Sequence, residues 1–290
     1  MLRAKKSQEP KCNVLITGVS TGIGFGAAKE FLDHGFRVFG SVRNKMDAER
    51  IKEDLGHNFT AVIFDVCDSE AINGAARQVE ELLDGETLHG LVNSAGIAVS
   101  GPLMHIEPDE FSRQLEINVT GVLRVIQAFL PLMGAKIGFE GRPGRIVNVS
   151  SVSGRIAFPF IGPYTASKHA LEALSDALRR ELMLYNIDVV VIEPGNTDTP
   201  IWEKAKQRPD YRDTDYAGII NLLRESLIDQ PKDALLDVKE VSRIIRLAVS
   251  LPDPKSRYLI LKRKFMGWYL PRILPDRWLD RIIAKRLGMI

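Results

Sequence analysis

The sequence predicts an α/β protein in which helices cover both faces of a doubly wound parallel sheet of about seven strands. Short runs that are nearly continuous in Val, Ile and Leu alternate with longer segments of helical periodicity over most of the chain. A glycine-rich turn joins the first apolar run directly to the first helical segment. No stretch rich in Pro, Gly or Ser interrupts this alternation, so we expect a single domain.

Seven apolar runs are expected to form the strands, because strands that are buried on both faces of a parallel sheet lack polar alternation. They are residues 13–17, 36–42, 60–64, 88–92, 145–149, 188–192 and 257–261. Five segments between them carry apolar residues three or four positions apart, which is the spacing of one helical face. These expected helices are residues 23–34, 70–83, 108–133, 164–185 and 238–250.

Three segments lie outside this alternation. Residues 1–11 are a polar, basic amino-terminal extension to a domain that spans residues 12–261. Residues 199–237 are a long irregular insertion after the carboxyl end of a strand, where open α/β sheets bind their ligands, so we expect a substrate lid there. Residues 262–290 are expected to form a basic, amphipathic helical tail.

The composition is ordinary for a globular domain, but the charge is distributed unevenly. Of the 290 residues, 45% are hydrophobic and 26% are charged, and the net charge is +2. Residues 255–290 carry +8, which leaves −6 on residues 1–254. The net charge does not indicate a nucleic-acid partner, and none is expected.

Cysteine and histidine usage favours a reducing compartment without a metal site. Cys12 and Cys67 are too few for a disulfide framework. None of the five histidines has a neighbour at metal-ligand spacing, so no metal is expected. The chain begins without an apolar leader and has no apolar run of membrane-spanning length. We therefore expect a cytoplasmic location, with peripheral membrane association through the tail as an open alternative.

The glycine-rich turn predicts a dinucleotide site of Rossmann type. Gly18, Gly22 and Gly24 permit a tight turn, close approach of a pyrophosphate and close packing of helix on strand. The intervening Ser20, Thr21 and Ile23 lie at the start of the helix, whose N-terminus attracts an anion. A simple turn from strand to helix is the alternative interpretation.

Tyr164 and Lys168 predict a proton-transfer site, because residues four apart share one face of a helix. A phenol with a pKa near 10 becomes useful at neutral pH only if the phenolate is stabilised by about 4 kcal/mol, or roughly three pKa units. An ammonium one turn away is a source of such stabilisation, so we expect it to lower the pKa of Tyr164. An ordinary surface contact is the alternative.

These motifs together resemble the short-chain dehydrogenase/reductase family. The glycine spacing is GxxxGxG instead of GxGxxG, and further family motifs follow successive strands up to about residue 200. They are Asp65-Val66, Asn93-Ser94-Ala95-Gly96, Ile117-Asn118-Val119, Ser150-Ser151 and Pro194-Gly195. The segments Ser41-Val42-Arg43, Leu88–Val92 and Pro163–Leu178 resemble its hydroxysteroid and retinol dehydrogenase branch.

The resemblance implies a catalytic set of Asn118, Ser151, Tyr164 and Lys168. Ser151 would polarise a carbonyl, and Tyr164 would exchange a proton with the substrate oxygen. Lys168 would hold the nicotinamide ribose and stabilise the phenolate, and Asn118 would bind a water that relays protons. A turn cap at Ser151 and a buried helix amide at Asn118 are the structural alternatives.

The resemblance also implies which residues bind the cofactor. They are Gly18, Ser20, Thr21, Gly22, Ile23, Gly24, Arg43, Asp65, Val66, Asn93, Ala95, Gly96, Tyr164, Lys168, Pro194, Gly195, Thr197 and Thr199. From Phe36 to Asn44 there is no Asp or Glu to hold a free 2′-hydroxyl, whereas Arg43 suits a 2′-phosphate. We therefore expect a preference for NADP(H), with NAD(H) possible.

The expected substrate is a lipophilic alcohol or carbonyl, because apolar residues 157–161 and the lid residues Ile201, Trp202 and Tyr211 lie around the site. The resemblance implies a homodimer or homotetramer through the helices that start near Pro108 and Tyr164. The tail has two interpretations, which are docking on the protein itself or a partner subunit and docking on an anionic membrane. The alternative to an enzyme is a non-catalytic, nucleotide-sensing or membrane-associated binding protein.

Overall fold

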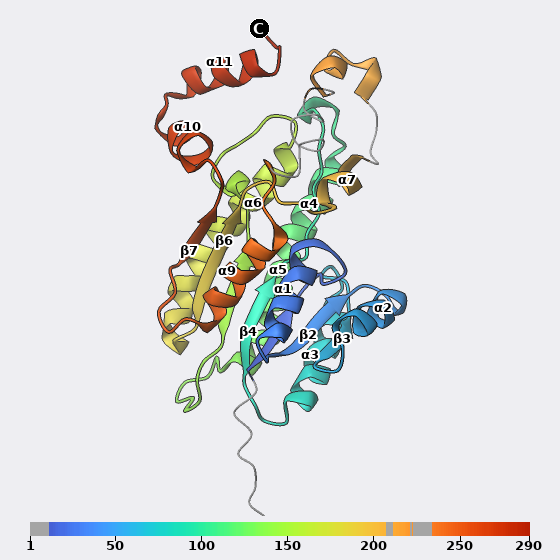
Figure 1. Ribbon diagram of the computed structural model, residues 1–290, viewed down its shortest axis with the longest axis vertical. Helices are drawn as coiled ribbons and strands as arrows, with labels where there is room; N and C mark the ends of the chain where they lie inside the picture. Colours follow the sequence, from blue (N-terminus) through green and yellow to red (C-terminus); the bar gives the residue numbers. More distant parts are fainter. Residues whose placement is uncertain (1–11, 207–210, 221, 223–233) are drawn as a thin grey trace, which may run out of the picture.

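A computed structural model describes residues 12–206, 211–220, 222 and 234–290, and its centre is a seven-stranded parallel sheet (Figure 1). The strand order is β3-β2-β1-β4-β5-β6-β7. The strands are β1 (Asn13–Ile16), β2 (Arg37–Val42), β3 (Phe59–Ile63), β4 (Leu88–Asn93), β5 (Arg145–Val149), β6 (Asp188–Pro194) and β7 (Arg257–Ile260). The order reverses direction at β1 and β4, so the carboxyl ends of these strands border a crevice.

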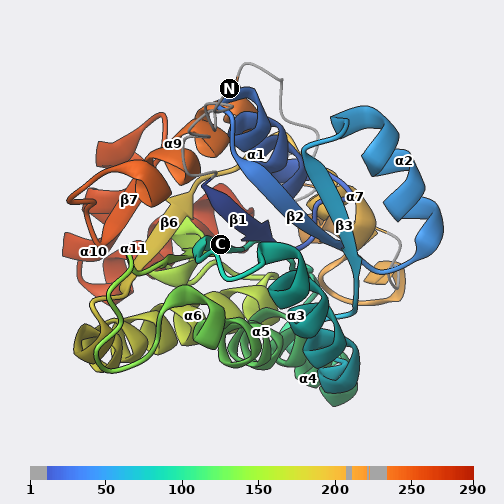
Figure 2. The same cartoon turned by 90° about the horizontal axis from the view of Figure 1, so that it is seen from below.

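Helices cover both faces of the sheet, as Figure 2 shows in a view along it. One face carries α1 (Gly22–Asp33), α2 (Lys45–Leu55) and α9 (Val238–Ser250). The other carries α3 (Ser69–Leu83), α4 (Pro108–Leu115), α5 (Gly121–Phe129) and α6 (Gly162–Glu181). The predicted fold class is confirmed.

Two hydrophobic cores lie on the two faces, because successive side chains of a strand point in opposite directions. From β1, Val14 and Ile16 enter the core under α1 and α9, whereas Leu15 enters the core under α3, α5 and α6. All three side chains are fully buried. The nearly continuous apolar runs in the sequence therefore reflect burial on both sides.

The predicted strands agree with the structure to within one or two residues, and the helices differ in two places. Helix α2 was missed because its sequence is polar and only Ile51 is buried. The expected helix 108–133 consists of α4, the π-helical turn Glu116–Thr120, α5 and the 3-10 turn Leu130–Met133. By length and composition alone, this stretch could cross a membrane. Its residues Val125 and Phe129 instead fill the core beneath the sheet.

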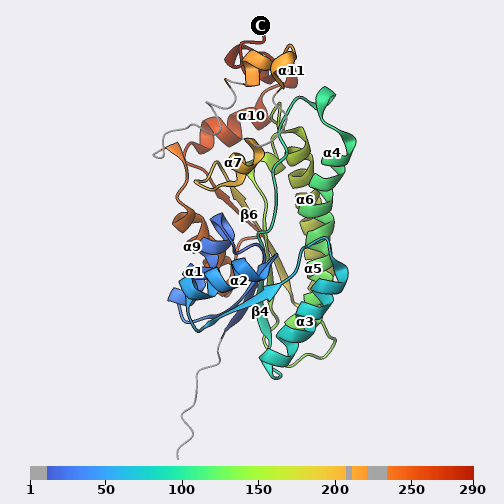
Figure 3. The same cartoon turned by 90° about the vertical axis from the view of Figure 1, so that its right-hand side faces the viewer.

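The segment expected to form a lid and the tail lie at the carboxyl end of the sheet, as Figure 3 shows. The described part of the lid includes α7 (Ile201–Lys206) and a 3-10 turn at Tyr211–Asp213. The tail forms a π-helical turn (Phe265–Tyr269), α10 (Leu270–Ile273) and α11 (Asp276–Arg286). The expected extension 1–11 and the lid positions 207–210, 221 and 223–233 lie outside the described residues.

Candidate active site

The glycine loop between β1 and α1 has a backbone that requires glycine. Gly18 and Gly22 have φ values of 72° and 62°, in the left-handed region that side chains disfavour. A Cβ on Gly18 would lie 2.8 Å from Cα of Ala95, and one on Gly24 would overlap the carbonyl oxygen of Gly18. This loop therefore exposes backbone without side chains at the N-terminus of a helix, so a pyrophosphate can approach it closely.

Side chains from neighbouring strands fix the loop. Ser41 Oγ in β2 accepts a hydrogen bond from the Gly18 N–H at 3.0 Å. Thr17 Oγ1 accepts hydrogen bonds from the N–H groups of Ser94 and Ala95, both at 3.0 Å. Thr17 thus connects the turn after β1 to the turn after β4, at the point where the strand order reverses. Both turns line the same cavity.

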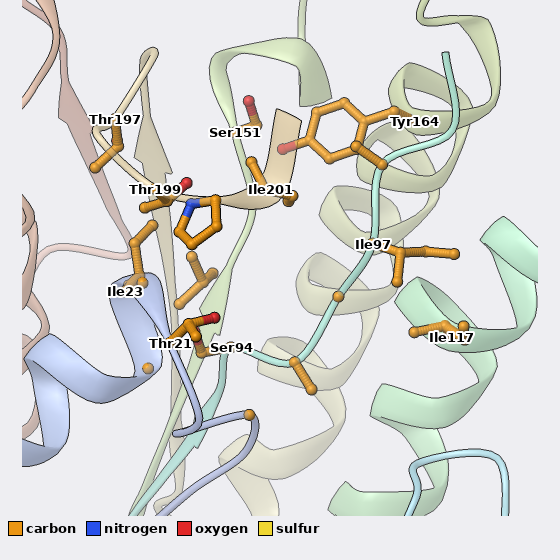
Figure 4. Close-up of a pocket in the computed structure, with 18 of the residues that line it drawn as sticks. Thr21, Ile23, Ser94, Ile97, Ile117, Ser151, Tyr164, Thr197, Thr199 and Ile201 are labelled. Carbon is orange, nitrogen blue, oxygen red and sulfur yellow. The ribbon is translucent and has the colours of Figure 1, made fainter. Parts of the chain in front are cut away.

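A cavity of about 650 Å³ opens at the carboxyl ends of the strands (Figure 4). It brings together eighteen of the twenty predicted site residues, which come from the carboxyl ends of six strands and from helix α6. They are Gly18, Ser20, Thr21, Gly22, Ile23, Gly24, Arg43, Asp65, Val66, Ala95, Gly96, Ser151, Tyr164, Lys168, Pro194, Gly195, Thr197 and Thr199. The residues expected to hold a dinucleotide therefore form one continuous surface.

Asn93 does not line this cavity, although we expected it to contact the cofactor. Its side chain is 3% exposed and donates to Asn148 Oδ1 at 2.9 Å. Asn148 in turn donates to Ser175 Oγ. The amide of Asn93 therefore joins β4 to β5 and α6 beneath the site, because burial directs a polar side chain to protein partners.

Asn118 also lies outside the cavity lining, at the π-helical turn between α4 and α5. Its Nδ2 donates to Ile97 O and Ser167 Oγ, at 3.0 and 3.1 Å, and its Oδ1 accepts from the Ile97 N–H. Both amide hydrogens are thus donated to protein atoms. The side chain is a buried helix amide that positions the loop after β4, and the water relay expected of Asn118 stays a prediction.

Gln114, one turn before Asn118, forms a second clamp on the same loop, and the sequence analysis missed it. Its Oε1 accepts from the Val99 N–H at 2.7 Å, and its Nε2 donates to Ile97 O at 2.9 Å. Ser167 Oγ accepts from both amides and donates to the carbonyl of Tyr164 at 2.7 Å. This network fixes the loop 97–99 against the turn of α6 that bears Tyr164.

Ser151 and Tyr164 lie next to each other in the cavity (Figure 4), and the phenol hydroxyl points toward Ser151. Trp202 of the lid packs edge-on against the Tyr164 ring, with 5.3 Å between ring centroids. Burial raises the pKa of the Tyr164 phenol, and the Ser151 hydroxyl opposes this shift. The expected lowering by Lys168 is therefore not seen in this structure, because desolvation of the phenol dominates.

Ser151 also caps the turn after β5, since its Oγ accepts from the Ser153 N–H at 3.1 Å. Its own hydroxyl lies 3.5 Å from the carbonyl of Pro194. The turn cap and a role in the site are compatible, because the Ser151 oxygen that accepts from Ser153 also belongs to a residue that lines the cavity. The cap holds Ser151 in place opposite Tyr164.

Lys168 is buried beneath Tyr164 and donates to the Val149 carbonyl at 2.8 Å. Its Nζ lies 5.7 Å from the centroid of the Tyr164 ring. Burial lowers the pKa of Lys168 to about 8, and the charge of Glu172 opposes this shift. The ammonium is accordingly poised to change charge just above neutral pH.

Glu172 belongs to a buried ionic cluster behind the cavity that the sequence analysis also missed. Arg155 and Arg257 each approach both Glu172 and Glu193, at N–O distances of 3.1 to 3.6 Å. Asp176 adds a 2.8 Å ion pair with Arg257. Burial, and then the charge of Glu172, raise the pKa of the Glu193 carboxyl to about 7.

The end of the cavity expected to receive the 2′-phosphate has two nearby arginines. Arg43 follows β2 and is exposed to the cavity. Arg50 of α2 donates to the Ser20 carbonyl at 3.1 Å and pairs with Asp47 at 2.8 Å. The charges of both arginines lower the pKa of Asp47, together with its hydrogen bonds to Arg50 and Asn44. Arg50 was missed because the helix that carries it was missed.

Apolar side chains line the opposite end of the cavity, next to Tyr164. Phe158, Ile161, Ile201 and Trp202 are among them, as expected. Phe160 instead packs against Tyr216, with 5.5 Å between ring centroids, and has a φ of 64°. Such a φ is unusual for a bulky residue and marks a strained turn at the rim of the site.

Comparisons with known proteins agree with this geometry. The sequence profile described as short chain dehydrogenase matches residues 12–210. An NADPH-dependent 3-dehydrocapnine reductase of Ornithobacterium rhinotracheale is 39% identical over 274 residues, which are 94% of this chain and 96% of that protein. Human retinol dehydrogenase 5 is 32% identical over 290 aligned residues, covering 94% of this chain and 89% of that protein.

A solved structure supports the fold independently. The crystal structure of a short-chain dehydrogenase from Streptomyces avermitilis superposes with a TM-score of 0.74 at 26% identity. The superposition covers 96% of this chain and 95% of that one. The similarity therefore covers nearly the whole chain and is not limited to the sheet.

Proposed function

Because the chain belongs to the short-chain dehydrogenase/reductase family, we propose that it is an NADP(H)-dependent oxidoreductase that interconverts a lipophilic ketone or aldehyde and the corresponding alcohol. The observation that carries this proposal is that Ser151 and Tyr164 line one cavity side by side, between the glycine loop and an apolar wall. A carbonyl oxygen between two hydroxyls is polarised, and its carbon is open to hydride attack.

In this proposal each residue has a distinct task. The cofactor supplies the hydride. Ser151 donates a hydrogen bond to the carbonyl oxygen, and Tyr164, kept protonated by its raised pKa, donates the proton that completes an alcohol. Lys168 would hold the nicotinamide ribose hydroxyls, and its charge would stabilise the phenolate that remains on Tyr164. In the oxidative direction, the same phenolate accepts the proton.

The cofactor preference rests on Arg43 and on the absence of a competing carboxylate from Phe36 to Asn44. A guanidinium binds a 2′-phosphate through paired, charge-assisted hydrogen bonds. The NADPH dependence in the name of the 39% identical relative supports this assignment. NAD(H) remains the second candidate, because Thr21 in the loop supplies no further positive charge.

The substrate class rests on the wall formed by Phe158, Ile161, Ile201 and Trp202. An apolar wall binds a lipophilic carbonyl compound better than a sugar or an organic acid. The names of the relatives, a retinol dehydrogenase and a 3-dehydrocapnine reductase, support an alcohol or carbonyl chemistry. A cytoplasmic homodimer or homotetramer, formed through α4, α5 and α6, is part of the same proposal.

The test is the variant Tyr164→Phe, compared with Tyr185→Phe in the turn that ends α6. Wild-type protein is screened with NADPH against steroids, retinoids and aliphatic ketones, and loss of NADPH absorbance is followed. Tyr164→Phe should lose about 10²- to 10⁴-fold in kcat while NADPH fluorescence shows unchanged binding. The control should resemble the wild type.

Near-normal turnover by Tyr164→Phe would reject the assigned role of the phenol. If the wild type binds NADPH tightly but turns over none of the carbonyl compounds, the non-catalytic binding protein becomes the better interpretation. Both outcomes can be distinguished by measuring NADPH binding and the loss of NADPH absorbance with the full chain.

A further inference from the structure

The last 26 residues expose an unusual amount of apolar surface. Large hydrophobic side chains with 38% to 76% exposure recur along the π-helical turn, α10 and α11. They are Phe265, Met266, Tyr269, Ile273, Trp278, Ile282, Met289 and Ile290. Elsewhere in the described residues, eleven such side chains are spread over more than two hundred positions. Exposed apolar side chains that are concentrated in one segment in this way indicate an interaction site.

One side of the tail is already docked on the body of the protein. Trp268 and Leu287 are buried, and Arg272 stacks on Trp268 at 5.0 Å. Leu287 and Met289 border a groove with Met104 and the lid residue Leu222. The first interpretation of the tail, docking on the protein itself, thus explains why Trp268 and Leu287 are buried. It does not explain the apolar side chains that stay exposed on the outer side of the tail.

The outer side of α11 combines apolar and basic residues. Trp278 and Ile282 are one turn apart and exposed, and Arg281 and Lys285 lie on the same side by helical spacing. Residues 262–290 contain eight Lys and Arg against two Asp. Lys and Arg side chains can cover apolar surface with their alkyl chains while their charged ends reach the lipid headgroups. Trp and Tyr side chains favour the boundary between water and lipid.

Figures 1 and 3 show α10 and α11 at the same end of the molecule as α7, whose residues Ile201 and Trp202 line the cavity. Leu103 and Met104 are 62% and 72% exposed, in the loop between β4 and α4. Leu103 packs against Gly162, the neighbour of the cavity residue Ile161, and Met104 Sδ accepts from the Tyr216 hydroxyl at 3.3 Å. The exposed apolar residues of the tail and of the rim therefore share one end of the sheet.

The geometry points to this end of the molecule as a docking surface for an anionic lipid bilayer, from which a lipophilic substrate enters the cavity. The entry of a lipophilic substrate from the bilayer rests on the proposed function, whereas the docking of the protein on the bilayer does not. Charge decides between lipid and a second copy of the chain. Two copies meeting through this surface would bring two strongly basic segments together, and like charges across an interface are unfavourable. Anionic headgroups complement the basic residues, and acyl chains accept Trp278 and Ile282.

Co-sedimentation of the full chain with phosphatidylcholine vesicles, with and without phosphatidylglycerol, tests the docking. We expect pelleting only with the anionic vesicles. The variants Trp278→Gln with Ile282→Gln and Arg281→Glu with Lys285→Glu should each reduce partitioning by about tenfold or more. The matched control is Ile137→Gln with Met183→Gln, two residues that are 77% and 70% exposed and lie near the opposite end of the sheet. It should pellet as the wild type does.

Turnover of a water-soluble ketone, and NADPH binding, are measured on the same variants and should not change. Failure of the docking therefore leaves these activities intact, whereas failure of the proposed function leaves the pelleting intact. Equal pelleting with and without phosphatidylglycerol, or equal pelleting of all variants, would overturn the proposal. So would a shift of the Trp278→Gln, Ile282→Gln variant to a smaller species in size-exclusion chromatography without reduced pelleting, because the surface would then join two copies.

Discussion

The ammonium of Lys168 and the carboxylate of Glu172 lie one turn apart on the buried side of α6, and the carboxylate raises the pKa of the lysine against the effect of burial. Glu172 does not line the cavity. It is held by Arg155 and Arg257, at 3.3 and 3.1 Å. The charge on a residue of the candidate active site thus depends on an ionic cluster behind it.

This relationship predicts the effect of Glu172→Gln on the pH profile of reduction. Lys168 is charged below its pKa of about 8 and loses its charge as the pH rises through that value. For the wild type, kcat/KM should therefore fall above about pH 8. Glu172→Gln removes the charge that raises this pKa, so the fall should begin at a lower pH. Asp176→Asn is the control, because Asp176 also pairs with Arg257 but lies a further turn along α6. Identical shifts in both variants would show a general effect of the cluster instead.

Arg43 and Arg50 should have different effects on cofactor binding, measured by fluorescence titration with NADPH and NADH. Arg43→Ala should weaken NADPH binding by roughly 10- to 100-fold and leave NADH binding nearly unchanged, because a charge-assisted contact to the 2′-phosphate contributes about 1.5–3 kcal/mol. Arg50→Ala should weaken both cofactors alike, since Arg50 holds the Ser20 carbonyl of the phosphate loop. Equal losses with Arg43→Ala would contradict its assignment, and a loss specific to NADPH with Arg50→Ala would place Arg50 on the phosphate.

Gln114 and Ser167 are expected to act as positioning residues. Gln114→Leu leaves the Val99 N–H without its side-chain acceptor and leaves the Ile97 carbonyl with the Asn118 amide alone, so it should lower the free energy of unfolding by about 1–3 kcal/mol. Because the loop 97–99 borders the cavity beside Tyr164, KM should rise more than kcat falls. Gln114→Glu keeps the acceptor for Val99 and should recover part of the stability. Urea unfolding and steady-state kinetics check these expectations, and an unchanged unfolding free energy in Gln114→Leu would contradict them.

Glu193 should make the protein less stable as the pH rises. Its pKa is raised from 4.5 to about 7, so between these values the folded state binds more protons than the unfolded state. The contribution of this group to the free energy of unfolding is complete below about pH 4.5 and is lost as the pH rises through about 7.

Glu193→Gln cannot ionise, so its free energy of unfolding relative to the wild type should increase by about 3 kcal/mol between roughly pH 5 and pH 8. Urea unfolding at both pH values measures this gain. The exposed Glu80→Gln should show no comparable gain, and a variant that loses stability relative to the wild type at the higher pH would contradict the prediction.

Local sequence patterns were sufficient for most of the fold. The strands could be predicted because burial on both faces imposes continuous apolar runs, as in β6, where the four residues from Val189 to Ile192 are all apolar and buried. Helix α2 escaped prediction because it lies on the surface and buries only Ile51. The π-helical turn at Glu116–Thr120 also escaped, since it interrupts the hydrogen-bond pattern of a helix without changing its apolar periodicity.

The glycine loop, the pair Tyr164 and Lys168, and the other motifs at successive strand ends could all be identified from the sequence alone. Glycine requirements and helical spacing are local properties, and parallel strands bring their carboxyl ends to one edge. Only the tertiary structure decided that Asn93 and Asn118 bind protein atoms, that Gln114 and Arg50 brace the site, and that burial raises the pKa of Tyr164. Hydrogen-bond partners and desolvation depend on groups distant in the chain, so no local pattern specifies them.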